Sequence, residues 1–301
     1  MLKIAFHPLY RIPLPERHRF PMEKYELVPQ QLLYEGTVEE SNYFAPDMVN
    51  IEHVLKVHSA EYVQSLLDQT MDRRAARKIG FPMTKTLVER ELRLIQGTLS
   101  NCEYAMEFGI SMNVAGGTHH AYAGHGEGFC LLNDQAVAAQ FLLDYWPAIK
   151  KILIVDLDVH QGNGTARIFQ NESRVFTFSI HGEGNYPFKK EKSDLDIPLP
   201  DNTEDEEYLS TLIDILPKLL NDEKPDFIFY LSGVDVLGTD KLGRLNLSID
   251  GCKERDRIVL EMCRNSGIPV QVSLGGGYSP NIKTIVDAHA NTFRLAQEIF
   301  F

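Results

Sequence analysis

The feature that most constrains the fold is a short apolar run that leads directly into three polar side chains. Residues 152–155 read I-L-I-V, and Asp156, Asp158 and His160 follow at alternate positions. The run predicts a strand buried on both faces. Side chains alternate along an extended chain, so the three polar groups point the same way. Burying them is costly unless they are paired or bind a cation, which predicts a chemical site where this strand ends.

The rest of the chain alternates predicted strands with predicted helices. Strands are expected at 2–6, 111–114, 151–155, 174–180, 226–231 and 269–274. Helices are expected at 59–68, 86–107, 134–145, 164–170, 206–220, 253–265 and 281–298. This alternation predicts a three-layer α/β/α fold with a mostly parallel central sheet, in one domain over residues 1–301. Residues 7–50 are expected to be irregular, and the charged stretch 72–78 to be a solvated face or loop.

Composition restricts the class of partner and the compartment. The 301 residues carry a net charge of −12, which argues against binding nucleic acid over a broad surface and favours a cationic or neutral substrate. No apolar stretch is long enough to span a membrane, and the N-terminus lacks the regions of a signal peptide. We therefore expect a cytoplasmic protein with no membrane partner. The four cysteines show no C-x-x-C spacing and are expected to be reduced thiols.

Polar clusters follow four of the predicted strands directly. The first is G-G-T-H-H at 116–120, the second contains Asp156, Asp158 and His160, the third is S-G-V-D at 232–235, and the fourth is G-G-G-Y at 275–278. The carboxyl ends of parallel strands share one edge of the sheet, and ligands bind in the crevice there. The sequence therefore predicts that these clusters form one site.

Three of these side chains have the composition of a catalytic metal site. Asp158, His160 and Asp235 offer two carboxylate oxygens and one imidazole nitrogen. Three protein ligands leave a coordination position open, which is typical of catalytic rather than structural zinc. The same ligands suit Fe²⁺, Mn²⁺ or Co²⁺, so the residues leave the identity of the metal open. A metal held in this way activates water near neutral pH.

The remaining polar groups suggest acid–base chemistry and stabilisation of an oxyanion. The adjacent His119 and His120 are candidates for general acid and base, and Asp156 and Asn163 are the nearby polar groups that could orient them. Tyr278 follows three glycines and is a candidate donor to an oxyanion. These roles predict an enzyme that uses water as its nucleophile.

A glycine-rich loop that includes Gly128 and Phe129 is expected to line a narrow channel. The motifs of other common enzymes are absent: G-x-S-x-G, H-E-x-x-H, Walker A and G-x-G-x-x-G do not occur. Their absence excludes the usual serine hydrolases, zincins, P-loop enzymes and dinucleotide-binding enzymes.

The ordered set of motifs resembles the histone deacetylase and acetoin-utilisation superfamily, which has the arginase-like α/β fold. The resemblance runs from K-V-H-S-A-E-Y-V near residue 60 to G-G-G-Y at 275–278. It includes G-G-T-H-H-A, G-F-C-L-L-N-D, D-L-D-V-H-Q-G-N-G and the G-V-D cluster. Q-G-N-G at 161–164 and G-V-D-V-L-G-T-D-K-L-G-R-L at 233–245 are most similar to the class IV branch.

The resemblance implies a zinc-dependent deacetylase that acts on acyl-lysine. It implies that Asp158, His160 and Asp235 bind zinc, that His120 is the general base and acid, and that Tyr278 polarises the carbonyl. Further roles are implied for residues around these. Asp156 orients His119, a structural K⁺ lies near Asp156, Asp158, His160 and Ser179, and the acyl-lysine tunnel is lined by Gly128, Phe129 and Tyr186.

The chain departs from the superfamily at three points. Asn163 stands where most members have Asp, so the second histidine has a neutral partner. Tyr186 replaces the usual Phe in a shorter loop, and Thr118 replaces a bulkier residue, which is expected to open space below the metal. These differences leave the acyl chain length open.

Two other functions remain open, as do several properties of the substrate. One alternative is a ureohydrolase-like enzyme of the same fold with two manganese ions, and the other is a non-catalytic acyl-lysine binding module. The sequence does not distinguish an acylated protein or peptide from an acylated polyamine or another small amide. The oligomeric state is also open.

Overall fold

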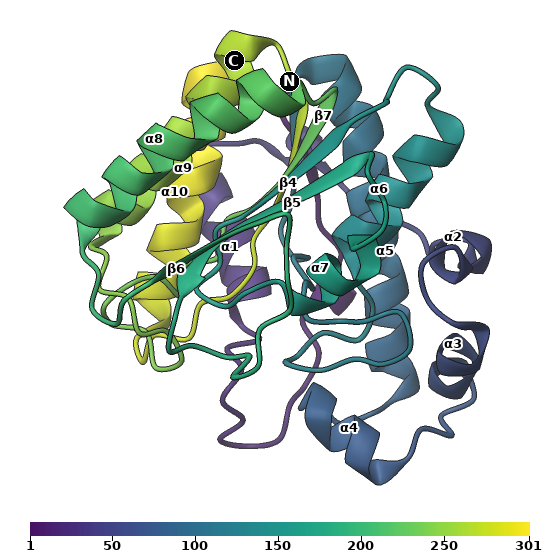
Figure 1. Cartoon of the computed structure of the whole chain (residues 1–301). Coiled ribbons are helices and arrows are strands. Elements are labelled where there is room, and N and C mark those ends of the chain that lie inside the picture. Colours follow the sequence, from purple (N-terminus) through teal and green to yellow (C-terminus); the bar gives the residue numbers. More distant parts are fainter.

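A single eight-stranded sheet forms the centre of the computed structural model, which describes all residues from 1 to 301 (Figure 1). The strands are β1 (Lys3–Ala5), β2 (Tyr43–Phe44), β3 (Ile110–Asn113), β4 (Ile152–Asp156), β5 (Val175–Gly182), β6 (Leu195–Leu199), β7 (Phe227–Leu231) and β8 (Val270–Ser273). Their order is β2-β1-β3-β8-β7-β4-β5-β6, and every neighbouring pair is parallel. The central strands β4, β7 and β8 are buried on both faces, and the sequences of β4 and β7 are continuous apolar runs of the kind that such burial requires.

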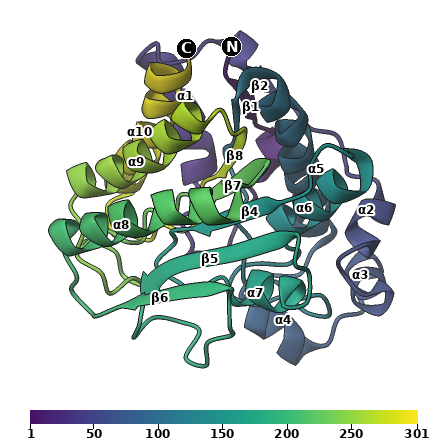
Figure 2. The ribbon, with the colours of Figure 1, turned by 45° about the horizontal axis from the view of Figure 1, so that its top comes forward.

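Helices cover both faces of the sheet and complete three layers. They are α1 (Lys24–Tyr34), α2 (Ile51–Leu55), α3 (Ala60–Leu67), α4 (Arg73–Ile79), α5 (Lys85–Phe108), α6 (Asp134–Tyr145), α7 (Asn163–Phe169), α8 (Asp205–Glu223), α9 (Ile249–Ser266) and α10 (Ile282–Phe300). Figure 2 shows α1, α8, α9 and α10 on one side of the sheet and α5, α6 and α7 on the other. The predicted α/β/α fold with a parallel sheet is confirmed.

The core is one continuous cluster of apolar side chains between the sheet and its helices. The four cysteines are buried free thiols, in agreement with the prediction of reduced thiols. None of the helices combines the length and the apolar character that crossing a bilayer would need.

All the predicted strands and helices are present, with ends shifted by a few residues at most. Two strands were missed, β2 and β6, and both lie at the outer edges of the sheet. β2 has two residues, and β6 reads L-D-I-P-L, which mixes polar side chains and a proline with its apolar positions. Edge strands carry fewer constraints on their side chains, so periodicity alone identifies them poorly.

The prediction that residues 7–50 are irregular is wrong for α1. Pro29 lies inside this helix, where a proline removes one backbone hydrogen bond and normally signals a break. The packing of α1 against α10 offsets that loss. Because the packing partner is far away in sequence, local pattern does not reveal the helix.

The charged stretch at 72–78 forms the short helix α4 rather than a loop. Asp72 caps its start by accepting a hydrogen bond from the backbone N–H of Arg74, and Gly80 ends it in the left-handed conformation with φ of 89°. Arg77 and Lys78 lie in the last turn, where positive charge suits the helix dipole, and both are exposed. The expectation of a solvated face therefore holds for the side chains.

A buried arginine on α9 supports the loops that follow β4 and β7. Arg255 donates hydrogen bonds to the backbone carbonyls of Leu157 (3.1 Å), Gly233 (2.6 Å) and Ser232 (3.3 Å). Its charge is balanced by Asp256, 2.7 Å away, and both side chains are completely buried. Arg255 thereby fixes the backbone next to the predicted metal ligands, a role that no sequence pattern indicates.

We expect Asp256→Ala to lower the free energy of unfolding by about 3–5 kcal/mol, because it leaves the Arg255 guanidinium buried without a counter-charge. The hydroxyls of Tyr230 and Thr292 would lose their acceptor as well. Urea denaturation measures the change. Arg257→Ala is the matched control on the same helix: its pair with Glu298 is exposed, so a loss of at most about 1 kcal/mol is expected. Equal losses in the two variants would contradict a structural role for the buried pair.

Candidate active site

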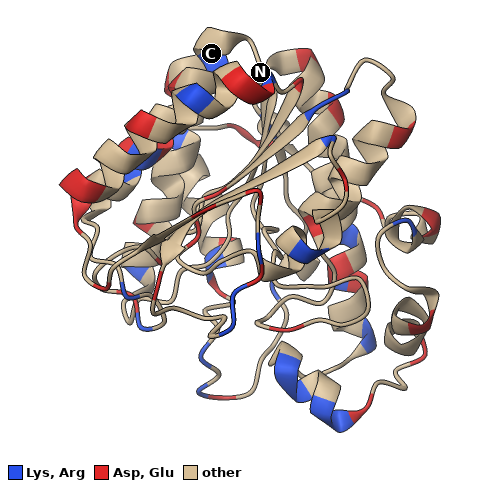
Figure 3. Cartoon of the chain, viewed as in Figure 1, with Lys and Arg blue, Asp and Glu red and all other residues tan.

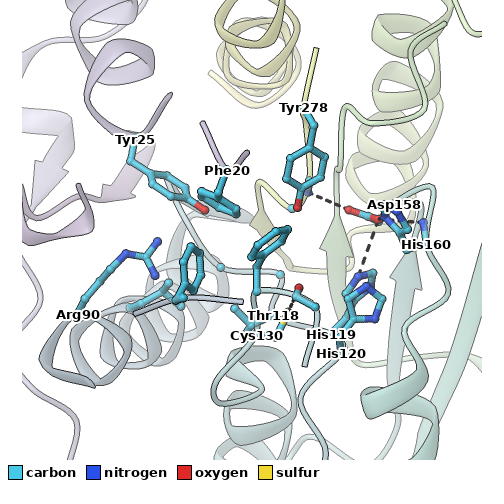
Figure 4. A pocket seen from close by; sticks show the side chains of 18 residues that line it. Phe20, Tyr25, Arg90, Thr118, His119, His120, Cys130, Asp158, His160 and Tyr278 are labelled. Carbon is cyan, nitrogen blue, oxygen red and sulfur yellow. Dashed lines mark hydrogen bonds and ion pairs between the residues drawn. The ribbon is translucent and has the colours of Figure 1, made fainter. Parts of the chain in front are cut away.

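The predicted metal ligands meet at the carboxyl edge of the sheet. Asp158 and His160 follow β4, and Asp235 follows the neighbouring strand β7. One ligand atom from each lies within 4.8 Å of the other two. His160 Nδ1 is 3.0 Å from an oxygen of Asp158 and 3.2 Å from Asp235 Oδ2. Figure 4 shows Asp158 and His160 beside the histidine pair.

The cluster has a free oxygen of the kind that a bound cation requires. Asp235 Oδ1 accepts from the backbone N–H of Val159 at 3.0 Å, but Oδ2 is buried without a hydrogen bond. Asp158 Oδ2 accepts from the N–H of Gly276 at 2.8 Å. An unpartnered carboxylate oxygen beside an imidazole and a second carboxylate fits a divalent ion with mixed oxygen and nitrogen ligands.

Charge crowding in the cluster shifts the pKa values of its members. Burial raises the pKa of Asp235 to about 7, and the nearby charge of Asp158 adds to the increase. Burial acts to lower the pKa of His160, but the hydrogen bond to Asp158 and the close negative charges of Asp235 and Asp158 outweigh it and raise the pKa to about 10. The two carboxylates therefore favour a positive charge at this position. A divalent cation would provide that charge and would keep a coordination position free for water or substrate.

Glycines allow the loop after β8 to close over the ligands. A Cβ added to Gly276 would collide with Asp235 Oδ2 and come within 2.8 Å of Asp158 Oδ2. Gly275 and Gly277 have φ of 70° and 154°, which other residues adopt only with strain. The G-G-G sequence is therefore required by close backbone approach to the cluster.

The two adjacent histidines are held by different partners. His119 Nδ1 lies 2.7 Å from Asp156 Oδ2, and His120 Nδ1 lies 2.6 Å from Asn163 Oδ1. Their ring centroids are 4.1 Å apart. The structure therefore brings together the four residues that the sequence analysis paired.

The amide of Asn163 links His120 to a carboxylate that the sequence analysis did not assign to the site. Asn163 Nδ2 donates to Glu127 Oε1 at 2.7 Å and to the hydroxyl of Tyr122 at 3.0 Å. With its amide nitrogen used in this way, the Oδ1 atom of Asn163 is left to accept the proton of His120 Nδ1. That tautomer leaves His120 Nε2 free to act as a base. No sequence spacing relates Glu127 or Tyr122 to Asn163.

The environments of the two histidines push their pKa values apart. Burial lowers the pKa of His119, but the charges of Asp156 and Asp158 outweigh it, so the net shift is upward. For His120, burial lowers the pKa, the charges of His119 and His160 lower it further, and the net value lies well below the ordinary one. Such a pair suits His120 as the neutral base and His119 as its cationic neighbour.

Tyr278 presents a neutral hydroxyl to the site. Its backbone N–H donates to Asp240 Oδ2 at 2.5 Å, which fixes the residue after the glycine loop. Burial raises the pKa of its hydroxyl well above the ordinary value, and the charges of Asp235 and Asp158 add to this. In Figure 4 the ring extends into the pocket between Phe20 and Asp158. The hydroxyl is thus a donor on the ligand side of the cavity.

An outer cavity of about 480 Å³ leads from the surface to the histidines. Phe129 and Tyr186 both line it, as expected for the tunnel walls, and the Tyr186 ring lies 5.0 Å from that of His120. Gly128 and Phe129 have φ of 56° and 66°. A Cβ on Gly128 would come within 2.6 Å of His120 Cδ2, so this wall needs a glycine. Strain at Phe129 is of the kind that is stored at functional sites.

An inner cavity of about 40 Å³ is lined by the two histidines and by Asp158 and His160, and it adjoins the outer cavity at Phe129 and Tyr278. Thr118 lines it, as expected, and so do several residues that the sequence analysis did not assign to the site. These are Phe20, Tyr25, Phe81, Arg90, Leu94 and Cys130. They come from the stretch treated as irregular, from the segment between α4 and α5, from α5 and from the loop before α6. Their aromatic content was visible, but only the fold places them together.

Thr118 has a structural function in addition to lining this cavity. Its hydroxyl donates to Asp134 Oδ1 at 2.7 Å and accepts from the backbone N–H of Asp134 at 3.0 Å. The residue therefore anchors the start of α6. A larger residue here would disrupt these bonds as well as fill the space.

The predicted K⁺ position is untested, although its residues are neighbours. Asp156 and Ser179 pair across β4 and β5. Ser179 Oγ lies 3.0 Å from Nδ1 of the buried His181. The K⁺ site stays a prediction.

Lys24 is a further residue near the site that the sequence did not predict. It is completely buried on α1, and its Nζ donates to the carbonyl of Gly275 at 2.8 Å. Burial lowers its pKa to about 8. Lys24 thus supports the glycine loop from below, a role that a lysine in an apparently irregular stretch does not suggest.

Comparison with known proteins agrees with this geometry. The histone deacetylase domain family matches residues 18–293. The chain belongs to the histone deacetylase family. Histone deacetylase 2 of Arabidopsis thaliana is 30% identical over 92% of this chain and 74% of its own length. An uncharacterized protein of Picosynechococcus is 42% identical over 99% of both chains.

Solved structures of histone deacetylase homologues share the fold. A homologue in complex with SAHA superposes with a TM-score of 0.82 at 24% identity, covering 98% of this chain and 82% of the other. The homologue from Aquifex aeolicus gives the same TM-score at 22% identity, covering 97% and 82%. The resemblance to the deacetylase superfamily that the motifs carried is therefore confirmed for this family member.

We expect one transition-metal ion per chain, measured by elemental analysis after dialysis, because the structure contains one cluster of three suitable ligands. Asp235→Asn keeps an acceptor for the N–H of Val159 but removes the charge of the carboxylate. Its metal content should therefore fall below about a tenth of an ion per chain. Asp201→Asn changes an exposed carboxylate away from the cluster and should retain the ion. Two tightly bound manganese ions, or full retention in Asp235→Asn, would contradict the assignment.

The neutral partner of His120 predicts a pH effect. Because Asn163→Asp alone would place a carboxylate against Glu127, the informative comparison is Asn163→Asp with Glu127→Gln, against Glu127→Gln by itself. A carboxylate beside His120 stabilises its protonated form and raises its pKa. Since the base must be neutral, the acidic limb of the kcat/KM profile should move to higher pH, by about one unit. A limb that stays in place or moves to lower pH would contradict this role of Asn163.

Proposed function

We propose that this family member is a metal-dependent deacetylase, with zinc as the first candidate metal, that hydrolyses the amide of an acetylated lysine side chain. One observation carries the proposal. The inner cavity is lined by two of the metal ligands, Asp158 and His160, together with the histidine pair and Tyr278, and Asp235 completes the ligand cluster beside it. This is the set of groups that hydrolysis of an unactivated amide requires.

Three side chains of the site each have a separate role in the proposed reaction. His120 Nε2 takes a proton from the attacking water, because Asn163 occupies its other nitrogen. Tyr278 donates to the carbonyl oxygen as negative charge develops there. The carbon–nitrogen bond then breaks, the proton passes from His120 to the leaving amine, and acetate and lysine result. His119, kept cationic by Asp156, stabilises the negative charge that forms beside it.

Asp158, His160 and Asp235 are the residues that would hold the metal. A divalent ion in this position supplies Lewis acidity toward water and toward the carbonyl oxygen. We further propose K⁺ as a structural cation near Asp156 and Ser179, supported by the pairing of Asp156, the last residue of β4, with Ser179 in β5.

The size of the inner cavity favours a short acyl group. Its 40 Å³ correspond to about three water-sized positions, close to the three heavy atoms of an acetyl group. The residues around it are packed closely: the ring centroids of Phe20 and Phe81 are 4.9 Å apart, and those of Phe20 and Phe129 are 5.2 Å apart. A long acyl chain would need these rings to move.

A turnover assay with purified protein tests the proposal. The substrates are one peptide carrying acetyl-, butyryl- or octanoyl-lysine, together with N-acetylated spermidine. Release of acetate from the acetyl peptide is expected to be the fastest reaction. Preferred hydrolysis of octanoyl-lysine would keep the enzyme class but contradict the acetyl preference. Binding of every compound without turnover would favour a non-catalytic binding module, and arginine-like turnover with two manganese ions would favour a ureohydrolase.

We expect Tyr278→Phe to fold and bind metal normally but to lower kcat about 100- to 1,000-fold, the range found when one oxyanion donor is removed. Steady-state kinetics with the acetyl peptide measure the effect, and metal content and melting temperature are followed in parallel. Tyr145→Phe, which changes an exposed tyrosine at the end of α6, is the control and should retain wild-type kinetics. A kcat within about threefold of wild type in Tyr278→Phe would rule out the proposed role of the hydroxyl.

A further inference from the structure

Four cationic side chains line the mouth of the outer cavity, and no carboxylate lines it. Arg19 lies in the loop before α1, Lys78 in the last turn of α4, and Lys241 and Arg244 in the loop after β7. These residues come from three segments that are distant in sequence, so their convergence does not reflect one basic run. Figure 3 shows α4 as a predominantly blue helix at the lower end of the molecule.

Three of the four cations have no acidic partner. Arg244 Nη1 lies 3.1 Å from Asp201 Oδ2, and this exposed pair is partly neutralised. Arg19, Lys78 and Lys241 form no ion pair within 4.0 Å, and all three are exposed. Their charge is therefore available to a molecule that enters the cavity.

The carboxylates nearest to the mouth along the chain are occupied or lie outside its lining. Asp240, next to one of the cations, accepts a hydrogen bond from the backbone N–H of Tyr278. Glu127 accepts from the amide of Asn163. Glu183 adjoins the mouth loop in sequence but does not line the cavity. The side chains that line the entrance therefore carry positive charge, and the carboxylates lie behind the lining.

Two of the cations are fixed to the tunnel wall itself. The guanidinium of Arg19 lies 4.9 Å from the ring centroid of Phe129, a cation–π contact. The backbone carbonyls of Lys78 and Ile79 accept hydrogen bonds from the N–H groups of Gly128 (3.1 Å) and Phe129 (2.7 Å). Because the C-terminal end of α4 is bound to the wall, the backbone of Lys78 is held at the entrance and its exposed side chain extends from there.

We propose that this mouth selects acetylated lysines that are flanked by carboxylates, as in an acidic peptide segment. The inference rests on the proposed deacetylase function and specifies its substrate class. Charges closer than the Debye length of about 8–10 Å still interact across water. Residues beside a bound lysine lie within that range of the mouth, so Asp and Glu there are attracted and Lys and Arg are repelled. Basic peptide tails and polyamines are disfavoured for the same reason.

The positive charge at the cavity mouth predicts a different substrate charge from the one that the net charge of the whole chain suggests. The net charge of −12 favoured a cationic or neutral substrate. Much of the acidic surplus lies on surface helices such as α8, whose first turn contains Asp205, Glu206 and Glu207. Charges far from the mouth are screened by salt, so the cations at the entrance decide which substrate approaches.

Three peptides of equal length test the proposal, each with one central acetyl-lysine flanked by Asp, by Ser or by Lys residues. We expect kcat/KM to decrease in that order, with at least about a tenfold difference between the Asp and Lys peptides at 50 mM salt and a smaller difference at 500 mM. The dissociation constants of fluorescein-labelled forms, measured by anisotropy on the Tyr278→Phe variant, should follow the same order. This second readout does not depend on turnover.

Removing two of the charges tests whether they cause the preference among the peptides. In the double variant Lys78→Gln/Lys241→Gln, the preference for the Asp peptide over the Lys peptide should fall about fivefold or more. This holds for the ratio of their kcat/KM values and for the ratio of their affinities. Lys218→Gln removes an exposed charge from α8 and should leave the ratio as in the wild type. Equal constants for the three peptides, a preference for the Lys peptide, or the same fall in Lys218→Gln would overturn the proposal. If no peptide is turned over while the order of affinities persists, the deacetylase function fails and the charge selection stands.

Discussion

The crowding of two carboxylates around one imidazole at the edge of the sheet is the interaction on which the rest of the structure depends. His160 is buried within ion-pair distance of both Asp158 and Asp235, and Oδ2 of Asp235 accepts no hydrogen bond. Such a cluster is unfavourable unless positive charge and fixed dipoles surround it. The neighbouring backbone supplies the dipoles through the N–H groups of Val159 and Gly276. A bound metal would supply the charge and the chemistry together.

Support for this cluster comes from helices on the outer layers of the fold. Arg255 on α9 holds the carbonyls next to two of the ligands, and Lys24 on α1 holds the carbonyl of Gly275 in the glycine loop. Both side chains are buried cations, and both contact backbone rather than the ligands themselves. The geometry of the site is therefore set by residues that take no part in the reaction, which is the arrangement that preorganised catalysis needs.

Charged groups at the two ends of the cavity have different effects. At its inner end, Asn163 gives His120 a neutral partner, and Glu127 is held one hydrogen bond further away. This keeps the base neutral while a carboxylate remains close enough to orient the network. At its outer end the cations Arg19, Lys78 and Lys241 face the solvent. In the proposed function, proton transfer and substrate choice would depend on different charges, separated along one channel.

The sequence by itself determined the parallel α/β fold, the site at the carboxyl edge and the candidate metal ligands, because strand periodicity and residue order dictate them. The partner of each histidine followed from the resemblance of the motifs to the superfamily. Tertiary structure alone decided the rest. Helix α1 forms despite Pro29 because α10 covers it, and Glu127 reaches Asn163 through a loop whose path no spacing encodes. The inner cavity and the cationic mouth join segments separated by tens to hundreds of residues. Their contacts depend on packing between distant elements, which a local pattern does not contain.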